Sequence, residues 1–221
     1  MSVRFGSAIF SAALLLAACS SGGGHASPTT TVVTPKGEHA SQAAANAALL
    51  PLADLPAGTT SQTLAKPSNV SCTSTPLVTK PRYLAVADYQ LPRSSTRLGD
   101  LVNIYAAGGA AQTMRNVREQ WNCPVARDLD HPDRQWSVAK LNFPSIAPGQ
   151  LSHGFQHSYA VQPNVTTSIT DDVLVLPVNS TSVLELSASA TSPKGRGVVD
   201  LSAFEDFARK AWTRAESALG R

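Results

Sequence analysis

The sequence lacks the short motifs that define the common enzyme classes. It contains no G-x-S-x-G nucleophile elbow, no phosphate-binding P-loop, no dinucleotide-binding glycine fingerprint and no H-E-x-x-H metalloprotease motif. It also shows no useful internal repeat. These absences remove the enzyme classes that short motifs reveal most readily, and we expect the protein not to be an enzyme.

An excess of charge of one sign is also lacking. The chain carries 18 Lys and Arg against 15 Asp and Glu, a formal net charge of +3 at pH 7, and its basic residues are scattered. Nucleic-acid-binding domains concentrate their cations on one face, so this balance argues against a nucleic-acid partner. Beyond the N-terminus, no apolar run approaches the roughly 20 residues that a transmembrane helix needs.

The N-terminus has the organisation of a bacterial lipoprotein signal peptide. Arg4 gives a short positive region, and the apolar run 8–18 is too short to cross a bilayer but fits the hydrophobic region of a signal peptide. Its end reads L-A-A-C, which matches the lipobox. We expect removal of residues 1–18 and a covalent diacylglycerol group on Cys19, which anchors the chain to the extracytoplasmic face of the cell membrane. The alternative is an ordinary secretory signal with a chance cysteine.

The mature chain divides into a tether and one domain. Residues 19–40 are mostly Ser, Gly, Thr and Pro with few large apolar side chains, which is typical of a flexible tether. Such a segment has a root-mean-square reach of roughly 25 Å. The remaining residues, 41–221, are enough for a single domain with its own hydrophobic core.

Cysteine is scarce, with three in the whole chain. If Cys19 carries lipid, only Cys72 and Cys123 remain, and in an oxidising exported compartment such a pair predicts a disulfide. It would close a loop of about 52 residues and stabilise the fold by roughly 4 kcal/mol. The alternatives are two free thiols or a metal site, although neither cysteine has a CxxC or CxxH neighbour.

Hydrophobic periodicity predicts an α+β fold, in which a mostly antiparallel sheet carries two main helices packed on one face. The two helices are 109–121 and 202–219, each with an apolar stripe at helical spacing, and Ser202 with Glu205 forms a capping box. A shorter helix is expected over 41–50. The expected strands are 83–89, 101–105, 135–141, 155–161, 165–169 and 173–178, while 183–190 fits a strand or a short helix.

Two polar clusters are candidate sites. His153 and His157 lie four residues apart on an expected strand, which puts both on one face. With a third ligand they would suit zinc, and with Ser152 they suggest a hydrolase, but the more ordinary interpretation is one exposed and one core-packed histidine. The second cluster, 128–133, holds three carboxylates and a histidine. It fits a divalent cation site or a solvated turn, of which we favour the turn.

One stretch of the chain resembles a known family. The sequence Val-Asn-Ile-Tyr at 102–105, a Gly/Ala turn, and a helix ending Glu-Gln-Trp-Asn-Cys at 119–123 are similar to the extracellular sensor domain of mycobacterial PknH-type serine/threonine kinases. That domain also occurs in free-standing mycobacterial lipoproteins. Further agreement, over roughly residues 42–219, comes from segments 49–55, 135–136, 157–159 and 164–165. Two features depart from the family: the kinase member is expected to hold two disulfides, and here Trp121 lies only two residues before Cys123.

The resemblance implies a two-helix, antiparallel-sheet domain with a cleft for an extracytoplasmic ligand, and it transfers no catalytic residue. The leading hypothesis is a lipid-anchored, sensor-like domain that binds a small molecule or a cell-envelope component and needs no cofactor. Its ligand-binding residues are unassigned apart from His153 and His157 as weak candidates. The alternatives are a protein–protein adaptor at the outer face of the membrane and, third, a cell-envelope hydrolase that uses one of these histidines.

Overall fold

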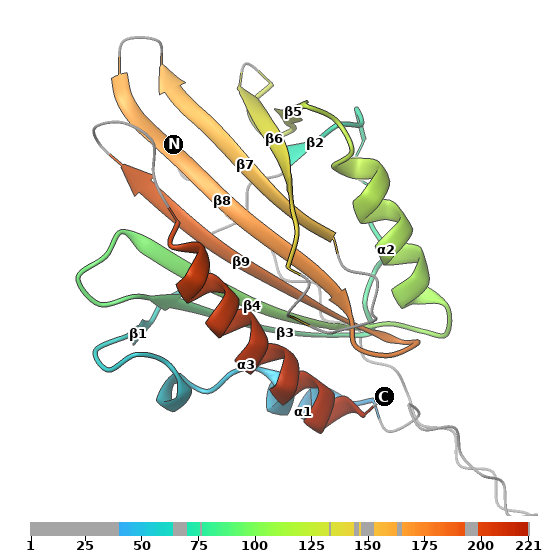
Figure 1. Ribbon diagram of the computed structural model, residues 1–221. Helices are drawn as coiled ribbons and strands as arrows, with labels where there is room; N and C mark the ends of the chain where they lie inside the picture. Colours follow the sequence, from blue (N-terminus) through green and yellow to red (C-terminus); the bar gives the residue numbers. More distant parts are fainter. Residues whose placement is uncertain are drawn as a thin grey trace, which may run out of the picture. The chain divides into compact units, whose positions relative to one another are not determined.

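A computed structural model describes residues 40–63, 70–75, 77–132, 134–143, 146, 153–162, 165–192 and 199–220, with the backbone alone for 153–168 and Ser192. The predicted signal peptide, Cys19 and the predicted tether up to residue 39 lie outside this part of the chain. The described elements form an α+β domain with α-helices, one 3-10 helix and antiparallel strands (Figure 1). In chain order they are α1 (Gln42–Ala48), η1 (Leu52–Asp54), β1 (Thr60–Ser61), β2 (Val70–Ser71), β3 (Tyr83–Gln90), β4 (Thr96–Ile104), α2 (Gly109–Gln120), β5 (Val125–Asp128), β6 (Gln135–Leu141), β7 (His153–Gln162), β8 (Val165–Pro177), β9 (Ser182–Ser192) and α3 (Leu201–Leu219).

The described strands pair antiparallel in the order β1-β3-β4-β9-β8-β7-β6-β5-β2. β7 connects a five-stranded part, β1-β3-β4-β9-β8, to a three-stranded part, β6-β5-β2. The long hairpin β8–β9 lies at the centre of the order, and the two edge strands contain only two residues each. Such short edges offer little backbone for pairing with another chain.

β8 is apolar on both faces, and this decides where the helices lie. Leu174 and Leu176 belong to the core with α1 and α3, whereas Val173 and Val175 pack with residues of α2. Because successive strand residues point to opposite faces, α2 lies on the other face of the sheet from α1 and α3. The prediction of two main helices on one face was therefore wrong. The apolar run 173–176 is typical of a strand that is covered on both sides.

The C-terminal helix α3 supplies most of the helical part of the core. Its buried stripe has the predicted positions, namely Phe204, Phe207, Ala208, Ala211, Trp212 and Ala215. The predicted capping box was wrong, because the helix begins at Leu201 and Asp200 is the N-cap. The Asp200 carboxylate accepts hydrogen bonds from the backbone N–H groups of Ser202 and Ala203, at 3.0 and 3.2 Å. Asp serves this role well because its short side chain reaches the free N–H groups of the first turn.

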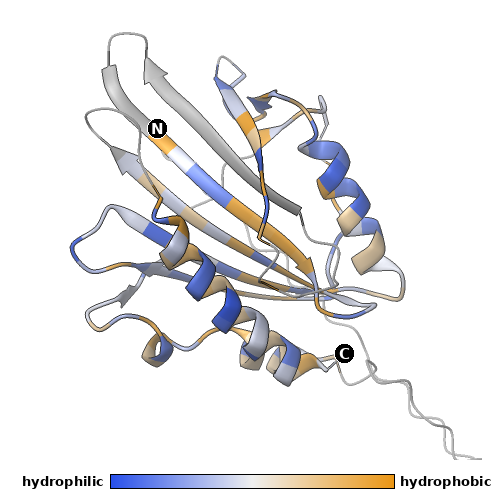
Figure 2. Cartoon of the chain, in the orientation of Figure 1, coloured by the Kyte–Doolittle hydropathy of each residue, from blue (hydrophilic) through white to orange (hydrophobic). Residues whose placement is uncertain are grey.

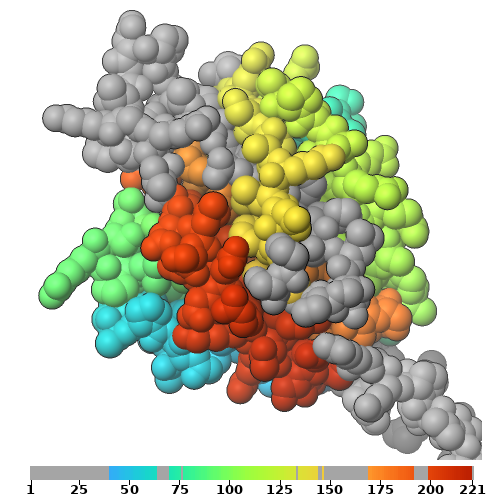
Figure 3. Space-filling model, viewed as in Figure 1, coloured from blue at the N-terminus to red at the C-terminus, as the bar shows by residue number. Residues whose placement is uncertain are grey.

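Cations on the exposed side of α3 hold the N-terminal segment of the domain. Arg214 Nε donates to the carbonyl of Ala47 at 2.8 Å, and Lys210 Nζ lies 3.4 Å from the carbonyl of Asp54. Both carbonyls lie near helix C-terminal ends, where a positive charge is favourable. Figure 2 shows the hydrophilic residues of α3 on its outer side, and Figure 3 shows the helix packed against the N-terminal residues of the domain.

Several strand predictions needed correction. The expected strands 165–169 and 173–178 are one strand, β8, because the polar residues between them continue the pairing with β7 and β9. Thr170 and Asp172 within this stretch are buried, so polarity did not mark a turn here. The segment 183–190, for which the sequence left a strand or a short helix open, lies within strand β9. Strands β1, β2 and β5 were not predicted, since each is four residues or shorter.

Candidate ligand-binding face

The predicted disulfide between Cys72 and Cys123 is confirmed. Their Cα atoms lie 5.9 Å apart. The backbone N–H of Cys72 donates to the carbonyl of Gln120 at 2.7 Å, and the indole Nε1 of Trp121 donates to the carbonyl of Val70 at 2.9 Å. The disulfide and these two hydrogen bonds fasten strand β2 to the C-terminal end of α2. The Trp121 side chain is partly buried against the cluster beneath α2.

Both predicted histidines lie on β7, where the structure describes the backbone. His153 is the register partner of Val175, and His157 is the partner of Asp171. Val175 packs toward α2. The prediction that the two histidines share a face concerns side chains outside the part that the structure describes. Ser152, the neighbour that suggested a hydrolase, lies outside the described residues.

The acidic cluster 128–133 is organised around one buried carboxylate. Asp128, the last residue of β5, is 3% exposed, and its Oδ1 accepts the backbone N–H groups of Asp130 and His131 at 3.0 and 3.1 Å. Its Oδ2 lies 4.0 Å from Arg134 Nη1. The carboxylate therefore serves the turn itself, as Asp does in turns generally. Within the described part of the chain no three metal-ligating side chains gather at one place, and Asp133 is outside that part.

A row of polar residues crosses the α2 face beside the apolar cluster under the helix. Neighbours in this row are register partners on adjacent strands, from β8 through β9 and β4 to β3. The row, called the polar row below, consists of Asp171, Ser189, Arg97 and Gln90, and the backbone of His157 on β7 is the register partner of Asp171. Register partners share a face and stand about 5 Å apart, so these residues form a continuous polar band.

Two carboxyls on this face are partly withdrawn from water. The pKa of Asp171 is raised overall. Burial is the largest cause, and the neighbouring charge of Asp172 adds to it, while a hydrogen bond with the Ser189 side chain acts in the opposite direction. Burial also raises the pKa of Glu185, four residues before Ser189 on β9. Asp171, Ser189 and Glu185 all keep partial exposure. Carboxyls with pKa values raised by burial are common at functional sites.

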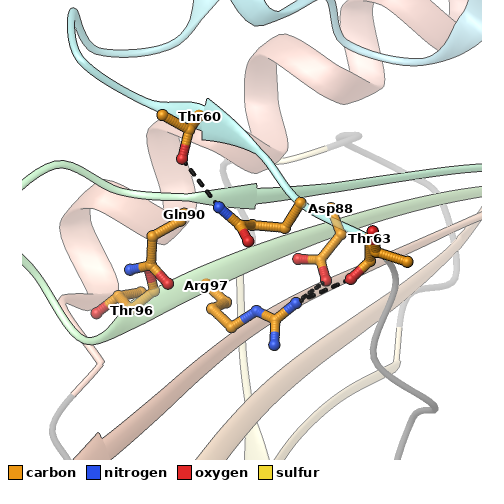
Figure 4. A network of polar contacts seen from close by, with 7 residues as sticks. Thr60, Thr63, Asp88, Gln90, Thr96 and Arg97 are labelled. Atoms are coloured by element: carbon orange, nitrogen blue, oxygen red, sulfur yellow. Dashed lines mark hydrogen bonds and ion pairs between the residues drawn. The ribbon is translucent and has the colours of Figure 1, made fainter.

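Arg97 supplies the positive charge of the polar row (Figure 4). Its Nη2 lies 2.5 Å from Asp88 Oδ2 and donates to the carbonyl of Thr63 at 3.3 Å. Among the described residues its buried Nε has no hydrogen-bond partner. Its side chain is one third exposed. Arg97 thus fixes the residues after β1 above this face.

Gly99 makes room for a second hydroxyl beside the polar row. Gly99 and Ser187 are register partners on β4 and β9, and a Cβ atom built on Gly99 would lie 2.4 Å from Ser187 Oγ. Any larger residue at this position would displace the serine. A glycine inside a strand often marks such a close approach, so Gly99 is a signal that sequence reasoning missed.

The order of residues in the polar row differs from that of a hydrolase triad. A Ser-His-Asp triad needs the imidazole between the hydroxyl and the carboxylate. Here Asp171 stands between Ser189 and the register position of His157, and two strand spacings, about 10 Å, separate the serine strand from the histidine strand. The row therefore presents hydrogen-bonding groups rather than an activated nucleophile.

A third perturbed carboxyl lies on the opposite face, in the core with α1 and α3. Asp100 is fully buried, and its Oδ2 accepts the backbone N–H of Leu50 at 2.7 Å. Tyr89 donates its hydroxyl to the carbonyl of the same leucine. Burial raises the pKa of Asp100 to about 7, and burial together with the Asp100 charge raises that of Tyr89 to about 12. The pair holds the chain after α1 against the sheet, and no sequence motif indicated it.

Comparison of the chain with protein-family models and with curated protein sequences finds no match. The resemblance to the kinase sensor domains therefore remains a prediction. The class that the structure establishes is an α+β domain with helices on both sides of an antiparallel sheet. Of the helices described, none has the length and apolar character to cross a membrane.

Proposed function

We propose that this protein is a lipid-anchored, extracytoplasmic binding domain of the sensor type, which takes a small polar molecule or a cell-envelope component on the α2 face of its sheet. The polar row is the observation that best supports this proposal. Its residues Asp171 and Ser189 are partly exposed, and burial raises the pKa of the Asp171 carboxyl. A partly desolvated carboxyl gains from a ligand that donates hydrogen bonds to it.

The chemistry of the face favours a hydroxyl-rich or amide-bearing ligand. Asp171 and Glu185 offer acceptors, Ser187 and Ser189 offer hydroxyls that both donate and accept, and the partly exposed guanidinium of Arg97 offers donors. Sugars and peptide-like envelope fragments carry matching groups. The apolar residues under α2, next to the row, add a surface for a hydrophobic part of the same ligand.

The location rests on the N-terminus. The lipobox at Cys19 supports lipid anchoring, and the disulfide between Cys72 and Cys123 agrees with an oxidising compartment. The resemblance to kinase sensor domains supports the sensor type. In this proposal diacylglycerol on Cys19 is the single covalent group, and the domain needs no metal or other cofactor.

Replacing Cys19 by Ala is expected to release the protein from the membrane fraction of its own cells, because the thiol that carries the lipid is lost. Fractionation and immunoblotting measure this directly. Ser20→Ala, next to the lipobox cysteine, is the matched control and should stay membrane-bound. A Cys19→Ala protein that remains wholly in the membrane fraction would disprove the anchor.

Ligand binding is tested with soluble fragments of the cell envelope, prepared by enzymatic digestion and screened by thermal shift and native mass spectrometry. A binding fragment should raise the melting temperature, and Asp171→Asn or Ser189→Ala should weaken its binding about tenfold, since each removes a hydrogen bond to the ligand. Asp206→Asn, on the exposed side of α3, is the control and should bind normally.

Equal binding by the wild type and both polar-row variants would place the ligand elsewhere. No shift with any fragment, combined with crosslinking of the domain to an envelope protein, would favour the adaptor hypothesis instead.

A further inference from the structure

Four residues between positions 78 and 84, from the loop before β3 into the beginning of that strand, form an exposed strip. Exposure alternates along this segment, so that every second residue from Val78 onwards faces solvent. The strip, called the basic strip below, consists of Val78, Lys80, Arg82 and Leu84. It presents an apolar residue at each end and two cations between them. Val78 is 77% exposed and Leu84 45%, so both apolar side chains are open to solvent.

The surroundings of the basic strip lack negative charge along the chain. No acidic residue occurs between Cys72 and Asp88. Asn116 Nδ2 donates to the Thr79 hydroxyl at 3.1 Å, which places the segment against α2. That helix carries two more exposed cations, Arg115 and Arg118, and one exposed acid, Glu119. The net charge around the strip is therefore positive.

The basic strip also lies where the tether reaches the domain. Gln42, the first residue of α1, donates from its Nε2 to the carbonyl of Leu84 at 2.8 Å. The chain thus enters the domain beside one end of the strip. If Cys19 carries lipid, about 20 residues of tether keep this entry point within roughly 25 Å of the headgroups.

We propose that the basic strip docks the domain on an anionic lipid surface. Lys80 and Arg82 contact acidic headgroups, while Val78 and Leu84 enter the interfacial region, the usual arrangement of peripheral membrane segments. A basic residue near an anionic bilayer strengthens binding about fivefold, and tethering makes the docking intramolecular. The proposal rests on the lipid anchor of the proposed function, and it assigns the domain a fixed orientation on the membrane.

The test uses the full-length mature protein, purified from the membranes of its own cells and placed in vesicles of phosphatidylcholine alone or with about one third phosphatidylglycerol. Acetylation rates of Lys80 and Lys140 are measured by mass spectrometry. Lys140 on β6 is exposed and outside the strip, so it is the internal control. Lys80 should react at least fivefold more slowly in the anionic vesicles, and high salt should restore its rate because it screens the headgroup charge.

Two variants make the test specific. Val78→Asp combined with Arg82→Glu should remove the protection of Lys80, whereas Val125→Asp, at another exposed apolar residue, should leave it intact. Equal rates for Lys80 in the two kinds of vesicle would overturn the proposal. Flotation of the vesicles separates the two hypotheses: loss of co-flotation refutes the lipid anchor, while intact co-flotation with unprotected Lys80 refutes docking alone.

Discussion

The wild-type domain is expected to lose stability as the pH rises from about 4 to 8, and the substitution Asp100→Asn is expected to remove most of this loss. Burial raises the pKa of this carboxyl from its ordinary value of 3.8 to about 7 in the folded state. The folded protein therefore binds a proton that the unfolded chain has already released. Stability from this group is complete below about pH 4 and is lost as the pH rises through 7. The difference is on the order of 4 kcal/mol.

Urea unfolding at pH 5 and pH 8 measures this effect. Asn keeps an oxygen that can accept the N–H of Leu50 and carries no charge, so it imitates the protonated acid. The free energy of unfolding of the wild type should be lower at pH 8 than at pH 5, and that of Asp100→Asn should change much less. The change that remains comes from Asp171 and Glu185, whose pKa values burial also raises. Asp206→Asn, at an exposed position, is the control. If the stability of Asp100→Asn falls with pH as much as that of the wild type, the buried acid does not titrate in this range.

Loss of the disulfide is the second large effect. Replacing both Cys72 and Cys123 by Ser should lower the free energy of unfolding by about 4 kcal/mol, because the bond joins residues 51 positions apart and restricts the unfolded chain. It also detaches β2 from the end of α2. For a domain of this size, such a loss lowers the melting temperature by roughly 10 °C.

Calorimetry of the double variant, and of the wild type with and without a reductant, checks this expectation. The reduced wild type and the double variant should melt at similar temperatures. A double variant as stable as the oxidised protein would mean that β2 is held by its backbone pairing with β5 and by Trp121 alone.

The long amphipathic elements were predictable from the sequence because their apolar spacing is regular. The helices 109–121 and 202–219 and the strand 135–141 were placed within one or two residues of their observed bounds. The disulfide was predictable by counting cysteines. The face on which α2 packs was not, because it depends on both sides of β8 being buried, and an apolar run alone does not say what covers each side.

The candidate face was less predictable than the fold. His157 was singled out from its spacing, but the polar row is built from four other strands, and the alignment of its residues depends on the register of the whole sheet. Asp100 and Arg97 gave no signal because nothing in their sequence neighbourhood shows that they face Leu50 and Asp88. Asp171 and Asp172 even misled the strand prediction, since adjacent acids are more typical of turns than of a central strand.

The strand order has a geometric consequence for the curvature of the sheet. β1 and β2 occupy opposite edges, yet Ser61 and Val70 are only nine residues apart in the chain, which can span at most about 32 Å. Eight strand spacings in a flat sheet measure about 38 Å. The sheet must therefore bend until its edges come within reach of this connection. The number of residues between β1 and β2 sets an upper limit on how far the domain can flatten, whether or not a ligand is bound.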